Sequence, residues 1–256
     1  CENSTDAEGC SDVEVIDWNC YQTVQIGEQV WLDENLKVTH YNNGDAISTE
    51  LSGESWLNLS TGAYAIYEND PINEQTYGNL YNWHAVVDER EICPAGWHVP
   101  DSLEWAVLVN HLGGSSVAGG KMKETGTEHW CGSDPTNCIN NGATNSSGFI
   151  GLPGGARTSN YDYLRGQGYF WSSIESTDNN AWRWNLTKDN SVIYHDDVSK
   201  AYGFSIRCIT NDIIAGCMDV SACNYNDSAT VNDGNCTYIG STQYVSKDGN
   251  SANCGS

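Results

Sequence analysis

Positive charge is scarce in this sequence. Of its 256 residues, 11 are Lys or Arg and 34 are Asp or Glu, which gives a net charge of −23 at pH 7. Such a chain repels phosphate backbones and anionic headgroups, so we expect no nucleic-acid partner. Apolar runs of the roughly 20 residues that span a bilayer are also missing, so we expect no transmembrane segment. No signal peptide begins the sequence, and we therefore expect a mature or trimmed form.

Catalytic motifs are missing as well. The sequence contains no nucleophile elbow, zinc-protease helix, P-loop or dinucleotide fingerprint, each of which requires a particular spacing of residues. The six histidines are scattered along the chain, at His40, His84, His98, His111, His129 and His195. We therefore expect that the protein is not an enzyme.

Aromatic and cysteine residues are plentiful. The chain has 39% hydrophobic residues, with 10 Trp and 14 Tyr, which is enough for a real core. Its 11 cysteines form no CxxC pair and indicate a disulfide framework made in an oxidising compartment. We therefore expect an extracellular or cell-surface protein. The odd count leaves one thiol over: Cys1 resembles the lipid-anchored first residue of a bacterial lipoprotein, or it pairs within this chain or with a neighbouring one.

Two helices are predicted from the pattern of apolar residues. The first covers residues 77–87, where apolar side chains recur at helical spacing. The second covers residues 101–112, because Asp101 and Glu104 have the spacing of a capping box and Gly113 follows the last apolar residue.

Antiparallel strands are predicted on both sides of these helices. A hairpin is expected at residues 21–32 around Gly27, and later strands at residues 181–187, 191–195 and 203–210. Residues 44–62 are rich in turn residues and predict a surface loop. The segment from residue 120 to residue 169 predicts long loops, which are often functional.

Several phrases of the sequence match one family in order. They are Tyr77-Gly78-x-Leu80-Tyr81-Asn82-Trp83, Ile92-Cys93-Pro94-x-Gly96-Trp97-His98-Val99-Pro100, Gly148-Phe149-x-x-Leu152-Pro153-Gly154-Gly155, Phe170-Trp171-Ser172-Ser173 and Ser205-Ile206-Arg207-Cys208. Together they resemble the Fibrobacter succinogenes major paralogous domain, a bacterial secreted family whose fold looks like a C-type lectin domain and is related to the formylglycine-generating-enzyme fold. The resemblance covers roughly residues 17–210. It implies an α+β domain of two helices, antiparallel strands and long loops.

The resemblance also implies a disulfide between Cys93 and Cys208. Cys131 and Cys138 are outside the family pattern, and we expect them to close one loop locally. Sugar-binding C-type lectins hold calcium through a Glu-Pro-Asn or Gln-Pro-Asp loop and a Trp-Asn-Asp triplet, and neither is intact here. Trp184-Asn185-Leu186 lacks the final carboxylate, so we expect no calcium-dependent sugar site of that kind.

The tail has a resemblance of its own. Gly216-Cys217-x-Asp219-x-x-Ala222-Cys223-Asn224-Tyr225-Asn226 and Asp233-Gly234-x-Cys236 resemble Cys-rich Asp/Asn repeats of Bacteroidota surface proteins. With few apolar residues, this segment requires disulfides, metal or a neighbouring domain for stability, and Cys217, Cys223 and Cys236 are its candidate disulfide residues. Candidate calcium ligands are Asp219, Asn224, Asn226, Asp227 and Asp233, although Asp and Asn are also ordinary turn residues. Ser228 lies in a triplet that resembles an O-glycosylation signal.

A candidate ligand surface lies on the loops between residues 113 and 169 and on the strand after them. Aromatic and arginine side chains, which bind sugars and proteins alike, gather there. The candidates are Tyr161, Tyr163, Arg165, Trp182 and Arg183. The alternative is that the aromatic residues fill a core, which we favour for Trp171 and Trp184.

These observations predict three segments and leave two functions open. Residues 1–15 are an acidic linker, 16–211 a C-type-lectin-like domain, and 212–256 a Cys-rich Asp/Asn module with the start of a following segment. The first function is a non-catalytic surface adhesin that binds a glycan or a protein. The second is a structural subunit of an extracellular filament, with copies of itself as partners. A formylglycine-generating-enzyme-like oxidase is a distant third.

Overall fold

The computed structural model describes residues 22–49, 51–132, 134, 136, 138–210, 214–219, 221–226, 229–232 and 234–238. The predicted linker and Cys1 lie outside these residues. The helices are α1 (Gly53–Leu57), α2 (Pro71–Tyr77), α3 (Trp83–Val86), α4 (Ser102–His111) and α5 (Ser115–Met122), with a 3₁₀ helix, η2 (Tyr67–Asn69). The strands are β1 (Thr23–Ile26), β2 (Gln29–Leu32), β3 (Tyr64–Ala65), β4 (Leu80–Asn82), β5 (Ala156–Arg157), β6 (Tyr161–Asp162), β7 (Gln167–Glu175), β8 (Asn180–Thr187), β9 (Ile193–Ser199), β10 (Gly203–Phe204), β11 (Ile209–Thr210), β12 (Ala215–Gly216) and β13 (Val231–Asn232).

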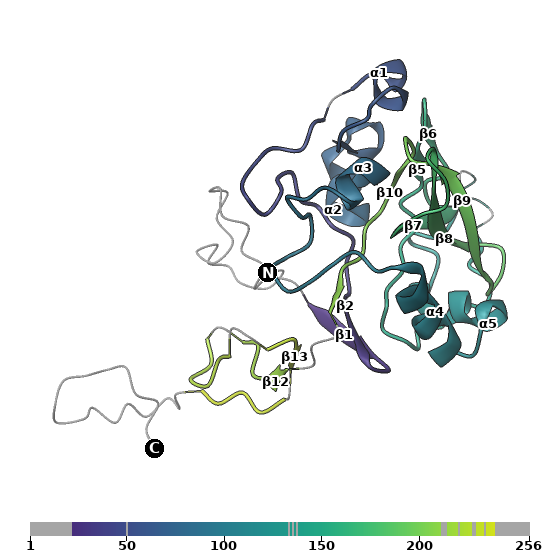
Figure 1. The fold of residues 1–256 in the computed structure, drawn as a ribbon. Coiled ribbons are helices and arrows are strands. Elements are labelled where there is room, and N and C mark those ends of the chain that lie inside the picture. Colours follow the sequence, from purple (N-terminus) through teal and green to yellow (C-terminus); the bar gives the residue numbers. More distant parts are fainter. Residues whose placement is uncertain are drawn as a thin grey trace.

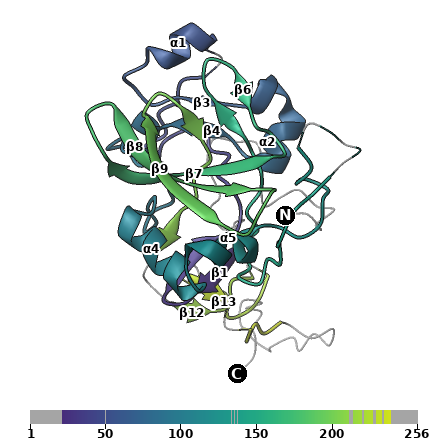
Figure 2. The same cartoon turned by 90° about the vertical axis from the view of Figure 1, so that its right-hand side faces the viewer.

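The predicted mixture of helices and antiparallel strands is present. The strands form the sheets β1-β2-β11, β3-β4-β10-β5-β6 and β7-β8-β9, all antiparallel, and the parallel pair β12-β13. Helices α4 and α5 lie beside the β7-β8-β9 sheet, whereas α1, α2 and α3 lie at the other end of the molecule (Figures 1 and 2). The β12-β13 pair lies next to β1, apart from the larger sheets.

Strand β7 connects the two halves of the core. Its residues Tyr169 to Ser172 are all buried, so side chains on both faces of the strand are covered. Phe170 joins a cluster with the apolar sides of α4 and α5, whereas Trp171 joins a second cluster with β4, α3 and β10. A short, continuously apolar run of this kind is typical of a strand buried on both faces. Trp171 and Trp184 are core residues, as the sequence favoured.

The predicted hairpin is confirmed, and so is the second helix. Strands β1 and β2 pair with Ile26 opposite Gln29, and Gly27 adopts the left-handed φ of 65° that this tight turn requires. At the start of α4 both hydrogen bonds of the capping box form between Asp101 and Glu104. Both elements are determined by neighbouring residues, which is why the sequence alone predicts them.

The first predicted helix, over residues 77–87, is wrong in most of its length. Helix α2 ends at Tyr77, strand β4 follows, and only Trp83–Val86 form a helix. Gly78 has a φ of 76°, and a Cβ at this position would lie 2.8 Å from both the Asn35 Cβ and the Leu36 carbonyl oxygen. The chain therefore packs too closely here for a continuous helix.

Three smaller expectations also need correction. The predicted surface loop at residues 44–62 contains α1, whose Trp56 is fully buried. Helix α5 follows Gly114, in a region where loops were expected. The single strand predicted at residues 203–210 is two short strands in different sheets, because β10 pairs with β4 and β11 pairs with β2. The segment between them places the Arg207 side chain inside the protein.

Two buried cations organise the loops around the core. Arg207 is fully buried, and its guanidinium donates hydrogen bonds to the Asn35 side chain and to the backbone oxygens of Leu32, Phe149 and Ile150. The Lys123 ammonium donates at 2.9 Å to the carbonyls of Asn141, Thr187 and Asn190. Each buried cation is thereby hydrogen-bonded to uncharged carbonyl and amide oxygens rather than to a carboxylate.

Candidate ligand pocket

A pocket of about 580 Å³ opens between segments that are far apart in the sequence. This volume is within the range of about 300–1,000 Å³ that is usual for small-molecule sites. The pocket is lined by residues of η2, of the loop closed by the Cys131–Cys138 disulfide, of the β6–β7 loop and of the turn after β8. They are Tyr67, Glu68, Gly132, Tyr163, Leu164, Arg165, Gly166, Gln167, Lys188 and Asp189.

The backbone of the pocket is strained. Seven described residues other than glycine have a positive φ, and three of them line this pocket: Glu68 at 54°, Tyr163 at 64° and Arg165 at 63°. The left-handed conformation costs an ordinary residue roughly 1–2 kcal/mol. Such strain persists only where the surroundings hold it, and it tends to occur at binding and catalytic sites.

Hydrogen bonds hold the strained β6–β7 loop in place. The Arg165 amide donates to the Pro153 carbonyl at 2.9 Å, and the Arg165 carbonyl accepts from the amides of Cys131 and Gly132 at 2.9 and 2.7 Å. The Tyr163 carbonyl accepts from two further amides, both at 3.0 Å. The loop is therefore preformed, and it fixes the start of the Cys131–Cys138 loop beside it.

The side chains of this loop combine an exposed ring with a partly open cation. Tyr163 is 58% exposed, and its ring contacts that of Tyr169 edge-on at 6.1 Å. The Arg165 Nη2 donates to the Glu128 carbonyl at 2.8 Å. Among the described residues, no carboxylate forms an ion pair with Arg165.

Polar groups at the start of β7 and in the turn after β8 complete the pocket. The Gln167 Oε1 accepts hydrogen bonds from the Tyr169 hydroxyl at 2.7 Å and from the Asn185 Nδ2 at 3.0 Å. The Gln167 side chain can therefore offer its amide nitrogen as a donor to a ligand. The Lys188 ammonium lies 3.0 Å from the Asp189 carboxylate. The pocket can therefore donate and accept several hydrogen bonds beside an aromatic ring.

A family model described as the Fibrobacter succinogenes major domain matches residues 24–210. The chain belongs to this family. No curated protein and no solved structure matches the chain. All the segments that line the pocket lie within the matched Fibrobacter succinogenes major domain, whereas β12 and β13 lie beyond it.

The ligand candidates of the sequence do not all meet at the pocket. Tyr163 and Arg165 line it. Tyr161 instead packs on the Tyr67 ring at 5.0 Å and carries the Arg157 guanidinium 4.4 Å from its ring centroid. Tyr161 therefore packs on the lining residue Tyr67 without lining the pocket itself.

The two candidates on β8 also lie away from the pocket lining. Arg183 is 4.4 Å from the centroid of the Tyr169 ring, which Tyr163 also contacts, and it pairs with Asp196 at 3.0 Å. Trp182 stacks on His195 with a centroid distance of 4.5 Å, and Trp184 covers the other face of His195 at 4.3 Å. These rings form a separate stack on the sheet.

Sequence reasoning missed several lining residues, among them Glu68, Gln167, Lys188 and Asp189. Lys188 and Asp189 have the pattern of a hairpin turn, and that pattern conceals any further role. The one available signal was the rarity of cations, since Lys188 is among only 11 in the chain.

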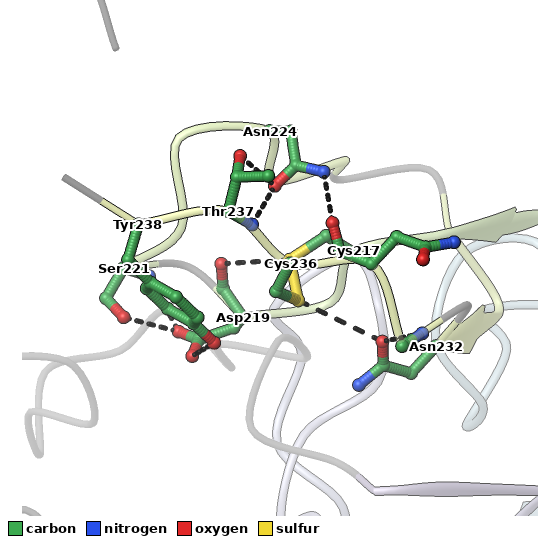
Figure 3. The surroundings of a disulfide bond; sticks show 10 residues. Cys217, Asp219, Ser221, Asn224, Asn232, Cys236, Thr237 and Tyr238 are labelled. Carbon is green, nitrogen blue, oxygen red and sulfur yellow. Dashed lines mark hydrogen bonds between the residues drawn. A yellow bond between two sulfur atoms is a disulfide. The ribbon is translucent and has the colours of Figure 1, made fainter. Parts of the chain in front are cut away.

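The C-terminal module of this Fibrobacter succinogenes major domain protein is held by side-chain hydrogen bonds and a disulfide (Figure 3). Asp219 accepts from the Ser221 amide and hydroxyl and, through its second oxygen, from the Tyr238 hydroxyl at 2.6 Å. The Asn224 Oδ1 accepts from the Thr237 amide at 2.8 Å and from its hydroxyl at 3.0 Å. The hydrogen bonds from Ser221 and Tyr238 lower the pKa of Asp219.

Among the candidate calcium ligands, Asp219 makes the local hydrogen bonds of a turn with Ser221, whereas Asn224 joins two segments of the module. Asn226 lies beside Gly216, and its backbone amide donates to the Cys217 carbonyl at 2.9 Å. The remaining candidate ligands, Asp227 and Asp233, and the candidate glycosylation residue Ser228 lie outside the described residues. Within the described part of the chain, no cluster of three or more His, Cys, Asp or Glu side chains is placed to hold a metal ion.

Disulfides join distant and local segments of the chain. The pairs are Cys93–Cys208, Cys131–Cys138 and Cys217–Cys236, and Cys223 is also disulfide-bonded. The first joins the end of the α3 region to the start of β11, while the second closes a loop beside the pocket. No helix in the described ranges has the length and apolar character needed to cross a membrane.

Proposed function

We propose that this protein is a non-catalytic extracellular binding module with a C-type-lectin-like fold, and that it binds a glycan in the pocket at Tyr163 and Arg165. One observation carries the proposal: three strained, non-glycine residues line a single preformed pocket that presents an exposed aromatic ring. Strain of this kind is retained where a site must be rigid before its ligand arrives.

Several further features support this function. Sugar sites combine an aromatic ring with groups that accept and donate hydrogen bonds, and Tyr163, Glu68, Gln167 and Lys188 supply both kinds. The disulfides favour an oxidising environment such as the cell exterior. The pairing of the first hairpin, β1-β2, with the last strand of the domain, β11, and the long loops support the lectin-like assignment.

A pair of matched variants tests the site. Tyr163→Asn removes the ring and substitutes a residue that tolerates a positive φ, whereas Tyr194→Asn removes another exposed tyrosine, on β9. The full chain is applied to a glycan array, and hits are measured by titration calorimetry. We expect Tyr163→Asn to abolish binding and Tyr194→Asn to preserve it. An array without hits, or hits that Tyr163→Asn leaves unchanged, would refute a glycan site in this pocket, and capture of a protein instead would favour a protein ligand.

A filament subunit is the second candidate, and the position of the C-terminal module favours it. The Thr23 hydroxyl of edge strand β1 donates to the Thr230 carbonyl at 3.1 Å, and it lies 3.8 Å from the Met218 sulfur. The described residues between 214 and 238 then belong to a module that packs on β1, and such a contact can form within one chain or between copies.

Electron microscopy of the purified chain tests this alternative, with and without a calcium chelator. Fibres that dissolve when calcium is removed would support a calcium-binding module that joins subunits. Single particles under both conditions would contradict the filament model and leave the binding module in place.

A further inference from the structure

We propose that the pocket binds the acidic group of an anionic sugar, a carboxylate or a sulfate, through Arg165. This inference rests on the glycan-binding function proposed above and specifies the class of glycan. It follows from the distribution of charge and of hydrogen-bond donors around the pocket.

Arg165 lines the pocket with much of its hydrogen-bonding capacity unused. Of the ten Lys and Arg residues in the described part of the chain, five form ion pairs, namely Lys37, Arg90, Arg183, Lys188 and Lys200, and three donate to two or more protein oxygens, namely Lys123, Arg157 and Arg207. Within the described residues, the Arg165 guanidinium forms no ion pair, although it lines a pocket. It makes a single hydrogen bond, from Nη2 to the Glu128 carbonyl, and its enclosed Nε has no partner. A guanidinium with free donors is suited to bidentate binding of a carboxylate or a sulfate.

Two neighbouring groups add donors beside this guanidinium. The Gln167 oxygen already accepts two hydrogen bonds, so its amide N–H groups are left for a ligand. The Lys188 side chain is 27% exposed and pairs with the more exposed Asp189. Arg165, Gln167 and Lys188 together provide the several N–H donors that the oxygens of an acidic group accept.

The remaining groups fit the rest of a sugar ring. Tyr163 presents an exposed aromatic face to C–H groups, and the carboxylates of Glu68 and Asp189 can accept hydrogen bonds from hydroxyls. The net charge of −23 repels a long polyanion. A single acidic group that contacts Arg165 interacts with it at full strength, whereas salt screens its repulsion by carboxylates more than about 8 Å away. The expected ligand therefore carries its charge on one sugar residue rather than along a chain.

Two disaccharides that differ in one group provide the test. Titration calorimetry with the full chain compares a disaccharide ending in glucuronic acid with the same disaccharide ending in glucose, and a 6-sulfated form distinguishes sulfate from carboxylate. We expect the acidic forms to bind about ten- to a hundredfold more tightly than the neutral form. Arg165→Asn introduces a residue that tolerates the positive φ of this position, and this variant should lose the preference for the acidic forms. Lys121→Gln makes the same change in net charge outside the pocket, and this variant should retain the preference.

The outcomes separate this inference from the function on which it rests. Equal binding of acidic and neutral disaccharides that depends on Tyr163 would overturn the anionic class and leave glycan binding intact. A preference that Arg165→Asn does not reduce would also overturn it. If neither disaccharide binds, the glycan array decides between the two proposals. Binding of a neutral glycan that depends on Tyr163 would overturn only the anionic class, whereas an array on which no glycan binds would overturn the glycan site itself. Lys188→Gln, which leaves the strained loop unchanged, should weaken acidic binding partially and serves if Arg165→Asn fails to fold.

Discussion

The two disulfides of the domain should differ in their effect on stability because they close loops of different length. The double variant Cys93→Ala/Cys208→Ala opens a loop of 115 residues, and Cys131→Ala/Cys138→Ala opens one of 7. On the chain-entropy model, the first loss lowers the free energy of unfolding by about 4.8 kcal/mol and the second by about 2.4 kcal/mol. Loop length alone predicts this difference of about 2.4 kcal/mol.

Urea unfolding followed by tryptophan fluorescence measures both values, and thermal unfolding provides an independent check. For a domain of this size, 1 kcal/mol corresponds to about 2–4 °C, so the first variant should unfold roughly 10–20 °C below the parent chain. Equal losses in the two variants, or a larger loss for Cys131→Ala/Cys138→Ala, would refute the argument from loop length. A reductant should remove the difference between each variant and the parent.

Three further predictions concern single side chains. Lys123→Met leaves three backbone carbonyls without their donor and should lower the free energy of unfolding by about 3 kcal/mol, as measured in urea. NMR titration should give His98 a pKa above the ordinary 6.5, because it is hydrogen-bonded to Glu104, and His195 a pKa below 6.5, because it is partly buried. The stabilisation from His98 is then complete below pH 6.5 and is lost as the pH rises through its raised pKa, and Glu104→Gln should abolish the raised value. Gly155→Ala forces a Cβ to within 2.5 Å of the Asp162 carbonyl oxygen at a φ of 69°, so we expect a lower melting temperature and weaker binding at the pocket.

Local sequence determines some elements of this fold, and those were predictable. The β1–β2 turn requires Gly27, and the start of α4 requires Asp101 and Glu104. The residues from 77 to 87 have helical periodicity, yet a close approach to Asn35 and Leu36 turns the chain at Gly78. Periodicity alone does not reveal such a contact, because the two segments lie more than forty positions apart.

The pocket was predictable only in part, for the same reason. Tyr163 and Arg165 stood out as an aromatic ring and a rare cation in a loop of small polar residues. Gln167, Lys188 and Glu68 reach the same pocket from other segments, and only the folded chain brings them together. The burial of Arg207 was equally hidden, since its oxygen acceptors, on Leu32, Asn35, Phe149 and Ile150, all lie more than fifty positions away in the sequence.

The Cys93–Cys208 bond also determines how the protein responds to a pulling force. When the two ends of the chain are pulled apart, tension that travels along the backbone crosses from Cys93 to Cys208 through the sulfur atoms. The chain between them, which spans a sequence separation of 115 and would extend to about 400 Å, is thereby withheld from stretching. All the ligand-pocket segments except η2 lie within this bypassed stretch, so a load on the chain ends leaves them largely unstretched.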